Sequence, residues 1–157
     1  MKNIEIERKF QVDPDKWSKE PKPAGILYHQ GYLCIDDQKV IRVRTAGSIG
    51  FFTIKGSSES FSRPEFEYEI PLDSAKQLLE LFAKYHVEKI RYKIFYKGHI
   101  WDVDEFLGDN EGLIMAEVEL STFEEFVELP EWIREEVTQD PKYYNSNLAQ
   151  LPYKKWK

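Results

Sequence analysis

The first strand-like segment of the chain carries two carboxylates and an ammonium group at alternate positions. Glu5, Glu7 and Lys9 are each separated by one residue, so an extended backbone places all three side chains on one face. Adjacent carboxylates repel each other unless a divalent cation lies between them. A lysine one step further along can reach a phosphate oxygen held by the same cation. Taken alone the pattern has low specificity, because many surface strands alternate glutamate and lysine.

Charged and apolar residues alternate in the same way in six further segments. Arg42 and Arg44, for example, share one face of an extended segment, and Ile41 and Val43 share the other. The charged positions of these segments are Arg42, Arg44, Lys55, Arg63, Glu65, Glu67, Glu69, Lys89, Arg91, Lys93, Asp102, Asp104, Glu117 and Glu119. An ordinary solvated sheet face mixes charged residues with neutral polar ones, whereas this face is almost purely ionic.

Two arrangements of the strands fit an ionic face. In a sandwich, the charged face points to solvent and keeps the protein soluble. In a closed barrel of eight strands, it points inward, where charges are costly unless water and a charged ligand enter. The alternation by itself does not distinguish the sandwich from the barrel.

Eight strands and three helices are expected. The predicted strands span residues 4–12, 26–34, 39–45, 50–56, 63–71, 87–96, 99–106 and 113–121. A helix capped by Asp73 should follow the fifth strand, because apolar residues then recur at helical spacing. A short helix is expected from Thr122, with Glu125 completing a capping box. Another is expected from Asp140, with Pro141 in its first turn.

Length and composition predict a single domain over residues 1–157, with 41% hydrophobic residues available for a core. The net charge of −6 argues against a general nucleic-acid binder. The sequence has no apolar run of the roughly 20 residues that span a membrane, and we expect no secretory leader because residues 1–5 lack the apolar stretch of a signal peptide. Its single cysteine, Cys34, cannot form an internal disulfide. We therefore expect a cytoplasmic protein without nucleic-acid or membrane partners; a homodimer is compatible with the sequence.

Nine short blocks together resemble the CYTH superfamily, also called triphosphate tunnel metalloenzymes. In chain order they are Glu5-Ile6-Glu7-Arg8-Lys9, Gln30-Gly31-Tyr32-Leu33, Ile41-Arg42-Val43-Arg44, Thr53-Ile54-Lys55-Gly56, Arg63-Pro64-Glu65-Phe66-Glu67, Glu88-Lys89-Ile90-Arg91-Tyr92, Asp102-Val103-Asp104, Glu117-Val118-Glu119 and Glu136-Val137-Thr138. They occur in the family's order and cover nearly the whole chain. The resemblance implies a mainly β (α+β) fold, an eight-stranded antiparallel closed β-barrel with a few flanking helices. It therefore favours the barrel over the sandwich.

The resemblance also implies a role for individual residues. The carboxylates expected to hold Mg²⁺ or Mn²⁺ are Glu5, Glu7, Glu117 and Glu119, with Asp104 and Glu67 as further ligands, directly or through water. The expected phosphate clamp is Lys9, Arg42, Arg44, Lys55, Lys89 and Arg91. Tyr32 and Lys89 match a pair considered for proton transfer in short bacterial members. The alternative for this pair is a barrel-wall tyrosine and a phosphate-binding lysine.

The family contains tripolyphosphatases, thiamine triphosphatases, RNA triphosphatases and class IV adenylate cyclases. The short chain and the position of its first motif favour the bacterial tripolyphosphatase branch, so we expect metal-dependent hydrolysis of tripolyphosphate or a related organic triphosphate. The alternatives are an adenylate cyclase that forms cyclic AMP and pyrophosphate, a thiamine triphosphatase, and a non-catalytic module that binds triphosphate or polyphosphate. No residues can be assigned to an adenine pocket. The sequence also contains no P-loop motif, and its 3 histidines lack zinc-site spacing.

Overall fold

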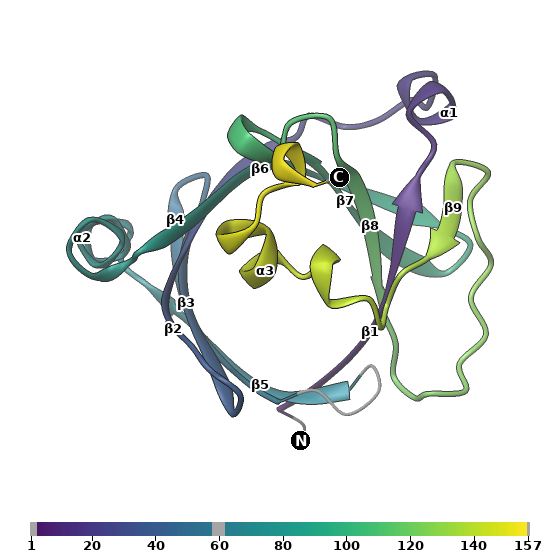
Figure 1. Ribbon diagram of the computed structural model, residues 1–157. Helices are drawn as coiled ribbons and strands as arrows, with labels where there is room; N and C mark the ends of the chain where they lie inside the picture. Colours follow the sequence, from purple (N-terminus) through teal and green to yellow (C-terminus); the bar gives the residue numbers. More distant parts are fainter. Residues whose placement is uncertain (1–2, 58–61, 157) are drawn as a thin grey trace.

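The computed structural model describes residues 3–57 and 62–156. In this part of the chain the strands form one antiparallel sheet in the order β5-β4-β3-β2-β6-β7-β8-β1-β9. Their bounds are β1 Ile4–Val12, β2 Ile26–Ile35, β3 Lys39–Ala46, β4 Ile49–Gly56, β5 Ser62–Ile70, β6 Tyr85–Tyr96, β7 His99–Phe106, β8 Ile114–Glu119 and β9 Ile133–Glu136. Pairing of β5 with β1 closes β1 to β8 into a ring (Figure 1).

Strand β1 closes the ring because it has different partners along its length. Its first residues pair with β5, with Glu5 opposite Arg63, and its later residues pair with β8, with Lys9 opposite Glu117. Strand β9 adds a further pairing on β1, with Phe10 opposite Glu136. Closure excludes the sandwich and confirms the predicted eight-stranded antiparallel barrel, with β9 as an additional strand.

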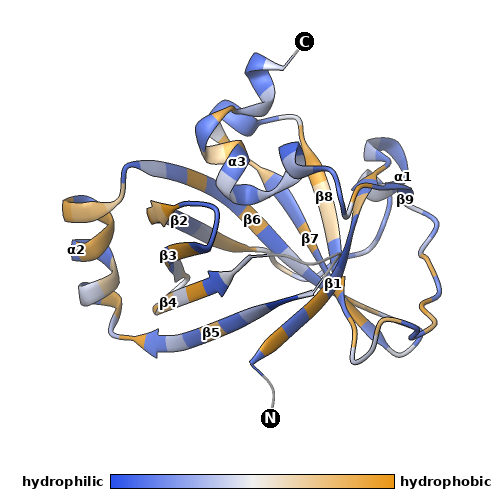
Figure 2. Ribbon diagram, turned by 60° about the horizontal axis from the view of Figure 1, so that its bottom comes forward, coloured by the Kyte–Doolittle hydropathy of each residue, from blue (hydrophilic) through white to orange (hydrophobic). Residues whose placement is uncertain are grey.

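The alternation of residue types separates the inside of the barrel from the outside. Hydrophilic and hydrophobic residues alternate along the strands in Figure 2. The main apolar cluster lies outside the bore and includes Phe10, Trp17, Trp101 and Trp132. The buried polar and charged residues are Glu5, Lys9, Gln30, Arg42, Thr53, Lys89, Arg91, Asp104 and Asn110. Most of these occupy the alternate strand positions that carry charged side chains, so the side chains that point into the barrel are mainly ionic.

The helices are short and lie outside the ring of strands or at its open end. They are α1 Pro14–Ser18, α2 Leu72–Phe82 and α3 Asn145–Gln150, with 3-10 turns at Gly108–Asn110, Pro141–Tyr143 and Tyr153–Lys155. Helix α2 covers β3 and β4, where Ala75 and Leu79 pack with Val43. A Cβ atom on Gly50 would lie 2.7 Å from that of Ala75, so glycine is required for this close approach. Helix α3 lies across the opening of the ring in Figure 1 and at one end of the barrel in Figure 2. Within the described residues, no helix is long and apolar enough to cross a membrane.

Three details of the helices differ from the sequence prediction. Helix α2 begins at Leu72 after Pro71, so Asp73 lies in its first turn and is not its cap. The helix predicted from Thr122 is wrong, because Glu125 instead accepts a hydrogen bond from the Ser121 amide at 2.6 Å and closes a turn. The helix predicted from Asp140 is divided into a 3-10 turn, which Asp140 caps, and the separate helix α3.

Candidate active site

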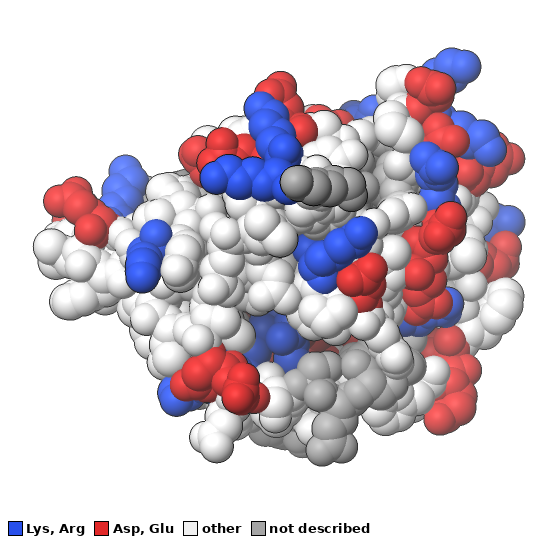
Figure 3. All heavy atoms as spheres, viewed as in Figure 1, with Lys and Arg blue, Asp and Glu red and all other residues white. Residues whose placement is uncertain are grey.

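A cavity of about 170 Å³ lies in the bore of the barrel and brings together almost all of the predicted site residues. The predicted residues that line it are Glu5, Glu7, Lys9, Tyr32, Arg42, Arg44, Lys55, Glu67, Lys89, Arg91, Glu117 and Glu119. Asp104 is the predicted residue that does not line it. Lysine and arginine atoms are visible in a recess on the face shown in Figure 3. Side chains that are far apart in the sequence therefore share one small, ionic chamber.

One wall of the cavity is a row of residues across β2, β3, β4 and β5. In the strand register Tyr32 lies opposite Arg42, Arg42 opposite Thr53, and Thr53 opposite Glu67. Oε2 of Glu67 accepts hydrogen bonds from Thr53 Oγ1 at 2.6 Å and from Arg42 at 3.1 Å, and lies 3.5 Å from Arg44. Burial tends to raise the pKa of Glu67, but Arg44 and Thr53 hold it below its usual value. Glu67 therefore fixes both arginines from the edge of the cavity.

The two arginines of this wall keep donors that have no partner. The Nε atoms of Arg42 and Arg44 are buried, and no hydrogen-bond acceptor is found for either within the described part of the chain. Burial and the nearby Arg42 and Arg91 lower the pKa of Arg44 to about 10. Buried donors without acceptors are costly unless a ligand supplies the acceptors. This wall is therefore suited to an anion with several oxygens.

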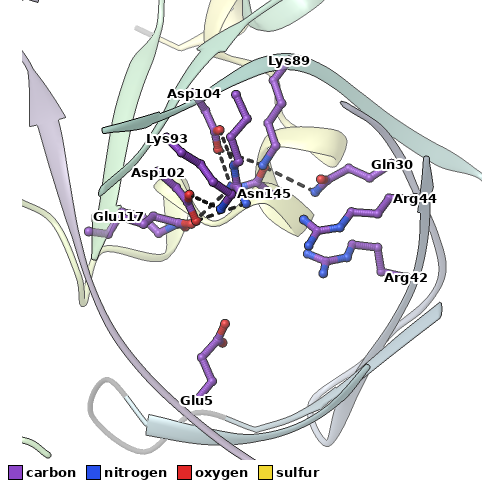
Figure 4. A network of polar contacts seen from close by, with 12 residues as sticks. Glu5, Gln30, Arg42, Arg44, Lys89, Lys93, Asp102, Asp104, Glu117 and Asn145 are labelled. Carbon is purple, nitrogen blue, oxygen red and sulfur yellow. Dashed lines mark hydrogen bonds and ion pairs between the residues drawn. The ribbon is translucent and has the colours of Figure 1, made fainter. Parts of the chain in front are cut away.

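The opposite wall holds a compact network on β6, β7 and β8 (Figure 4). Asp104 accepts two hydrogen bonds from Arg91, at 2.7 and 2.8 Å, and its Oδ2 lies 2.9 Å from Nζ of Lys89. Lys89 also donates to Oδ1 of Asn145 at 2.9 Å. Burial, only partly offset by Asp104, lowers the pKa of Lys89 to about 7. Despite its burial, Arg91 and Lys89 hold the pKa of Asp104 at about 2, so Asp104 is ionised.

The four glutamates predicted to hold metal fall into two pairs. Glu5 accepts from Lys55 at 3.0 and 3.1 Å, and Glu117 is ion-paired with Lys9 and lies 3.4 Å from Arg91. For Glu7 and Glu119, in contrast, the described residues supply neither a hydrogen bond nor an ion pair. Two of these four glutamates are thus paired with clamp cations, and the other two have no cation partner among the described residues.

The free glutamates lie in strongly acidic surroundings. Burial and the neighbouring Glu117 and Glu5 raise the pKa of Glu7 to about 8. Burial, Glu5 and Glu65 also raise the pKa of Glu119. Across the described residues, no three Asp, Glu, His or Cys side chains already converge on one point. The donor set nevertheless fits a divalent cation, because a positive charge between these oxygens relieves their repulsion and carboxylate oxygens are ligands of hard cations.

Tyr32 and Lys89 are connected through two intervening side chains. The phenol oxygen of Tyr32 accepts from Nε2 of Gln30 at 2.8 Å. The same Nε2 lies 3.3 Å from Oδ1 of Asn145, which is the acceptor for Lys89. Both residues line the cavity, but Gln30 and Asn145 connect them. Proton transfer by this pair therefore stays a prediction, as does its alternative, a wall tyrosine and a phosphate-binding lysine.

Several residues of the cavity were not selected from the sequence. They are Val40, Arg63, Glu65, Asp102, Thr138, Tyr144, Asn145 and Ser146. Strand alternation alone identifies three of them, Arg63, Glu65 and Asp102, because they lie on the same strand face as the predicted site residues beside them. Asn145 and Ser146 come from α3, and a strand pattern contains no signal that a later helix returns to the barrel opening.

Comparisons with known proteins give the relatives of this chain. The model of the CYTH domain matches residues 3–150. An inorganic triphosphatase of Acetivibrio thermocellus is 49% identical over 154 residues, covering 98% of this chain and 97% of that protein. An inorganic triphosphatase of Nitrosomonas europaea is 34% identical over 154 residues, covering 92% and 96% respectively. The crystal structure of the inorganic triphosphatase NE1496 matches with a TM-score of 0.63 and 31% identity, over 92% of this chain and 93% of that one. The chain therefore belongs to the CYTH family.

Proposed function

We propose that this protein hydrolyses inorganic triphosphate inside the barrel, in a reaction that depends on a divalent cation. The observation that carries the proposal is that one cavity in the bore holds, among the described residues, arginines with unpaired donors and carboxylates without a cation partner. Nε of Arg42 and Arg44 needs acceptors, and the oxygens of Glu7 and Glu119 need a positive charge. A phosphate chain bound together with a metal ion satisfies both. The similarity to two inorganic triphosphatases supports the same activity.

The lining of the cavity favours a substrate made only of phosphates. Val40 is the aliphatic residue among the described lining residues, and Tyr32 and Tyr144 are the aromatic ones. Binding a nucleobase or a thiamine ring normally requires a larger apolar surface. The lining therefore fits tripolyphosphate better than the substrates of an adenylate cyclase or a thiamine triphosphatase. A purely binding module would have no use for the free carboxylates of Glu7 and Glu119.

The residues that would hold the metal are the four glutamates, and we propose Mg²⁺ or Mn²⁺ as the ion. Glu7 and Glu119 are available without rearrangement. Glu5 and Glu117 become available when phosphate oxygens take over their partners Lys55 and Lys9. When bound, the cation would neutralise charge on the phosphate oxygens and lower the pKa of a nucleophilic water. Substrate binding and metal binding are thereby coupled through these ion pairs.

The basic residues perform the remaining tasks. Arg42, Arg44 and Arg91 can each grip phosphate oxygens with two hydrogen bonds, which orients the chain of phosphates in the tunnel. Phosphoryl transfer depends mainly on such positioning and on charge stabilisation. Lys89, whose pKa is lowered to about 7 by burial, holds a proton that it can give to the departing phosphate oxygen at neutral pH. Tyr32 forms the wall beside it.

The proposal is tested by comparing substrates under identical conditions. We expect kcat/KM for phosphate release, measured with Mg²⁺, to be highest for tripolyphosphate and lower for ATP and thiamine triphosphate. Formation of cyclic AMP from ATP, faster than phosphate release from tripolyphosphate, would replace the hydrolase by a cyclase. Tight binding of tripolyphosphate without turnover of any of the three substrates would indicate a binding module.

A further inference from the structure

We propose that Asp104 is a positioning residue that holds Lys89 and Arg91 in the orientation in which they meet the triphosphate, and that it is not a metal ligand. The inference rests on the proposed function, because the two cations are defined as a clamp by their phosphate ligand. Asp104 is 2% exposed and lies outside the lining of the cavity, whereas Lys89 and Arg91 both line it. Lys89 and Arg91 therefore lie between the cavity and Asp104.

The contacts of Asp104 leave neither oxygen unengaged. Oδ1 accepts from Nε of Arg91 at 2.7 Å, and Oδ2 accepts from its Nη2 at 2.8 Å. Oδ2 also lies 2.9 Å from Nζ of Lys89 (Figure 4). A metal ion at Asp104 would have to displace all three of these short contacts with buried cations, which is unfavourable. The two-point contact fixes the plane of the Arg91 guanidinium as well as its position.

The backbone register brings these side chains together. Arg91 lies directly opposite Asp104 in the β6–β7 ladder, and Lys89 is two residues earlier on the same face of β6. The next acceptors within reach of Arg91 are Glu117 at 3.4 Å and Asp102 at 3.5 Å. Without the Asp104 carboxylate, the guanidinium would turn toward these tunnel carboxylates and would no longer be available to phosphate.

Metal-free binding of tripolyphosphate to the full chain separates the two roles. If Asp104 were a metal ligand, Asp104→Asn would only remove negative charge from an anion-binding tunnel, so binding in EDTA would stay equal or become tighter. If Asp104 positions the clamp, binding in EDTA becomes weaker. We expect calorimetry to show a Kd for tripolyphosphate about tenfold higher than that of the wild type, as for loss of a charge-assisted contact. With Mg²⁺ we expect kcat to fall up to ~100-fold through misplacement of the clamp.

A matched control is available on the same strand. Asp102 lines the cavity but makes its short contact with Lys93, at 2.7 Å, and is 3.5 Å from Arg91. Asp102→Asn removes the same charge without releasing the clamp, so its metal-free Kd should equal or fall below that of the wild type. Tighter or unchanged binding by folded Asp104→Asn would overturn the inference.

A second variant keeps the test decisive if Asp104→Asn does not fold. Asp104→Glu retains the charge but shifts the carboxylate by one methylene group. Weaker metal-free binding by Asp104→Glu supports the positioning role, and wild-type affinity refutes it. A wild-type protein that neither binds nor hydrolyses tripolyphosphate would overturn the proposed function and this inference together. Normal wild-type turnover with unaltered affinity in the Asp104 variants would overturn the inference alone.

Discussion

Glu7 and Glu119 lie directly opposite each other in the β1–β8 ladder, and both carboxylates line the tunnel without a cation partner from the described residues. Side chains at opposite positions of antiparallel strands are close neighbours, and like charges there destabilise the sheet. Glu7 also lies close to Glu117 and Glu5, and repulsion from these two carboxylates raises its pKa at the point where the proposed mechanism requires a metal ion. Stability in the absence of metal is a direct measure of that repulsion.

Glu7 should make the metal-free protein less stable as the pH rises. Burial, Glu117 and Glu5 raise its pKa to about 8, whereas its ordinary value is 4.5. Between these values the folded protein binds a proton that the unfolded chain has released, so the free energy of unfolding falls with increasing pH. Glu7→Gln removes this contribution and should flatten the dependence. Melting temperatures in EDTA between about pH 5 and about pH 8.5 test it; an identical pH dependence in both proteins would contradict the assignment.

Glu5 and Glu119 should respond to the same substitution in opposite directions. Glu5 is buried and paired with Lys55 and Arg63, so Glu5→Gln removes the nearer counter-charge of Lys55, which among the described residues keeps only Glu65 at 3.6 Å, and should lower the free energy of unfolding by ~1–3 kcal/mol. Burial and the neighbouring Glu5, Glu65 and Asp102 raise the pKa of Glu119 and outweigh the opposing effect of Lys55, so Glu119→Gln should melt at or above the wild type. Denaturant unfolding in EDTA measures both changes. Shifts of the same sign would show that the two carboxylates share one environment.

Arg42 should be far more sensitive to truncation than an arginine on the outside of the barrel. Arg42→Ala removes a buried phosphate donor and should reduce kcat/KM for tripolyphosphate by ~10–100-fold, as for loss of a charge-assisted hydrogen bond. Arg8 is the matched control, because it pairs with Glu136 at 2.8 Å on the barrel exterior. Surface pairs of this kind contribute about 0–1 kcal/mol, so Arg8→Ala should remain nearly as active as the wild type. Equal losses in the two variants would argue against phosphate binding in the bore.

The sequence predicts the fold well because strand alternation records which side chains point inward. The charged side chains at alternate strand positions, such as Arg42, Lys55 and Glu67, point into a closed barrel. All three line its cavity. Alternation alone could not predict closure, which depends on β1 pairing with β5, and the family resemblance supplied that step. The predicted helix at Thr122 failed because the local capping signal was satisfied by a turn.

Contacts between charged residues were less predictable than their location. Strand parity groups Asp104 with the inward carboxylates, but only the β6–β7 register shows that it faces Arg91 rather than the cavity. The part played by Asn145 depends on how α3 packs at the barrel opening, which strand spacing does not encode. Strand alternation therefore identifies most residues of the site. The register between strands and the packing of α3 determine which of these residues are free to bind a ligand.

The most direct test of the account is phosphate release from tripolyphosphate by one preparation of the protein in EDTA, and again after addition of excess Mg²⁺ or Mn²⁺. The arrangement of Glu7 and Glu119 beside a phosphate clamp predicts no turnover in chelator and recovery of full turnover with either ion. In Glu7→Gln, excess metal should restore little of the activity, because an oxygen that holds the ion is missing. Undiminished hydrolysis in EDTA, or full activity of Glu7→Gln, would contradict a metal-dependent reaction in the tunnel.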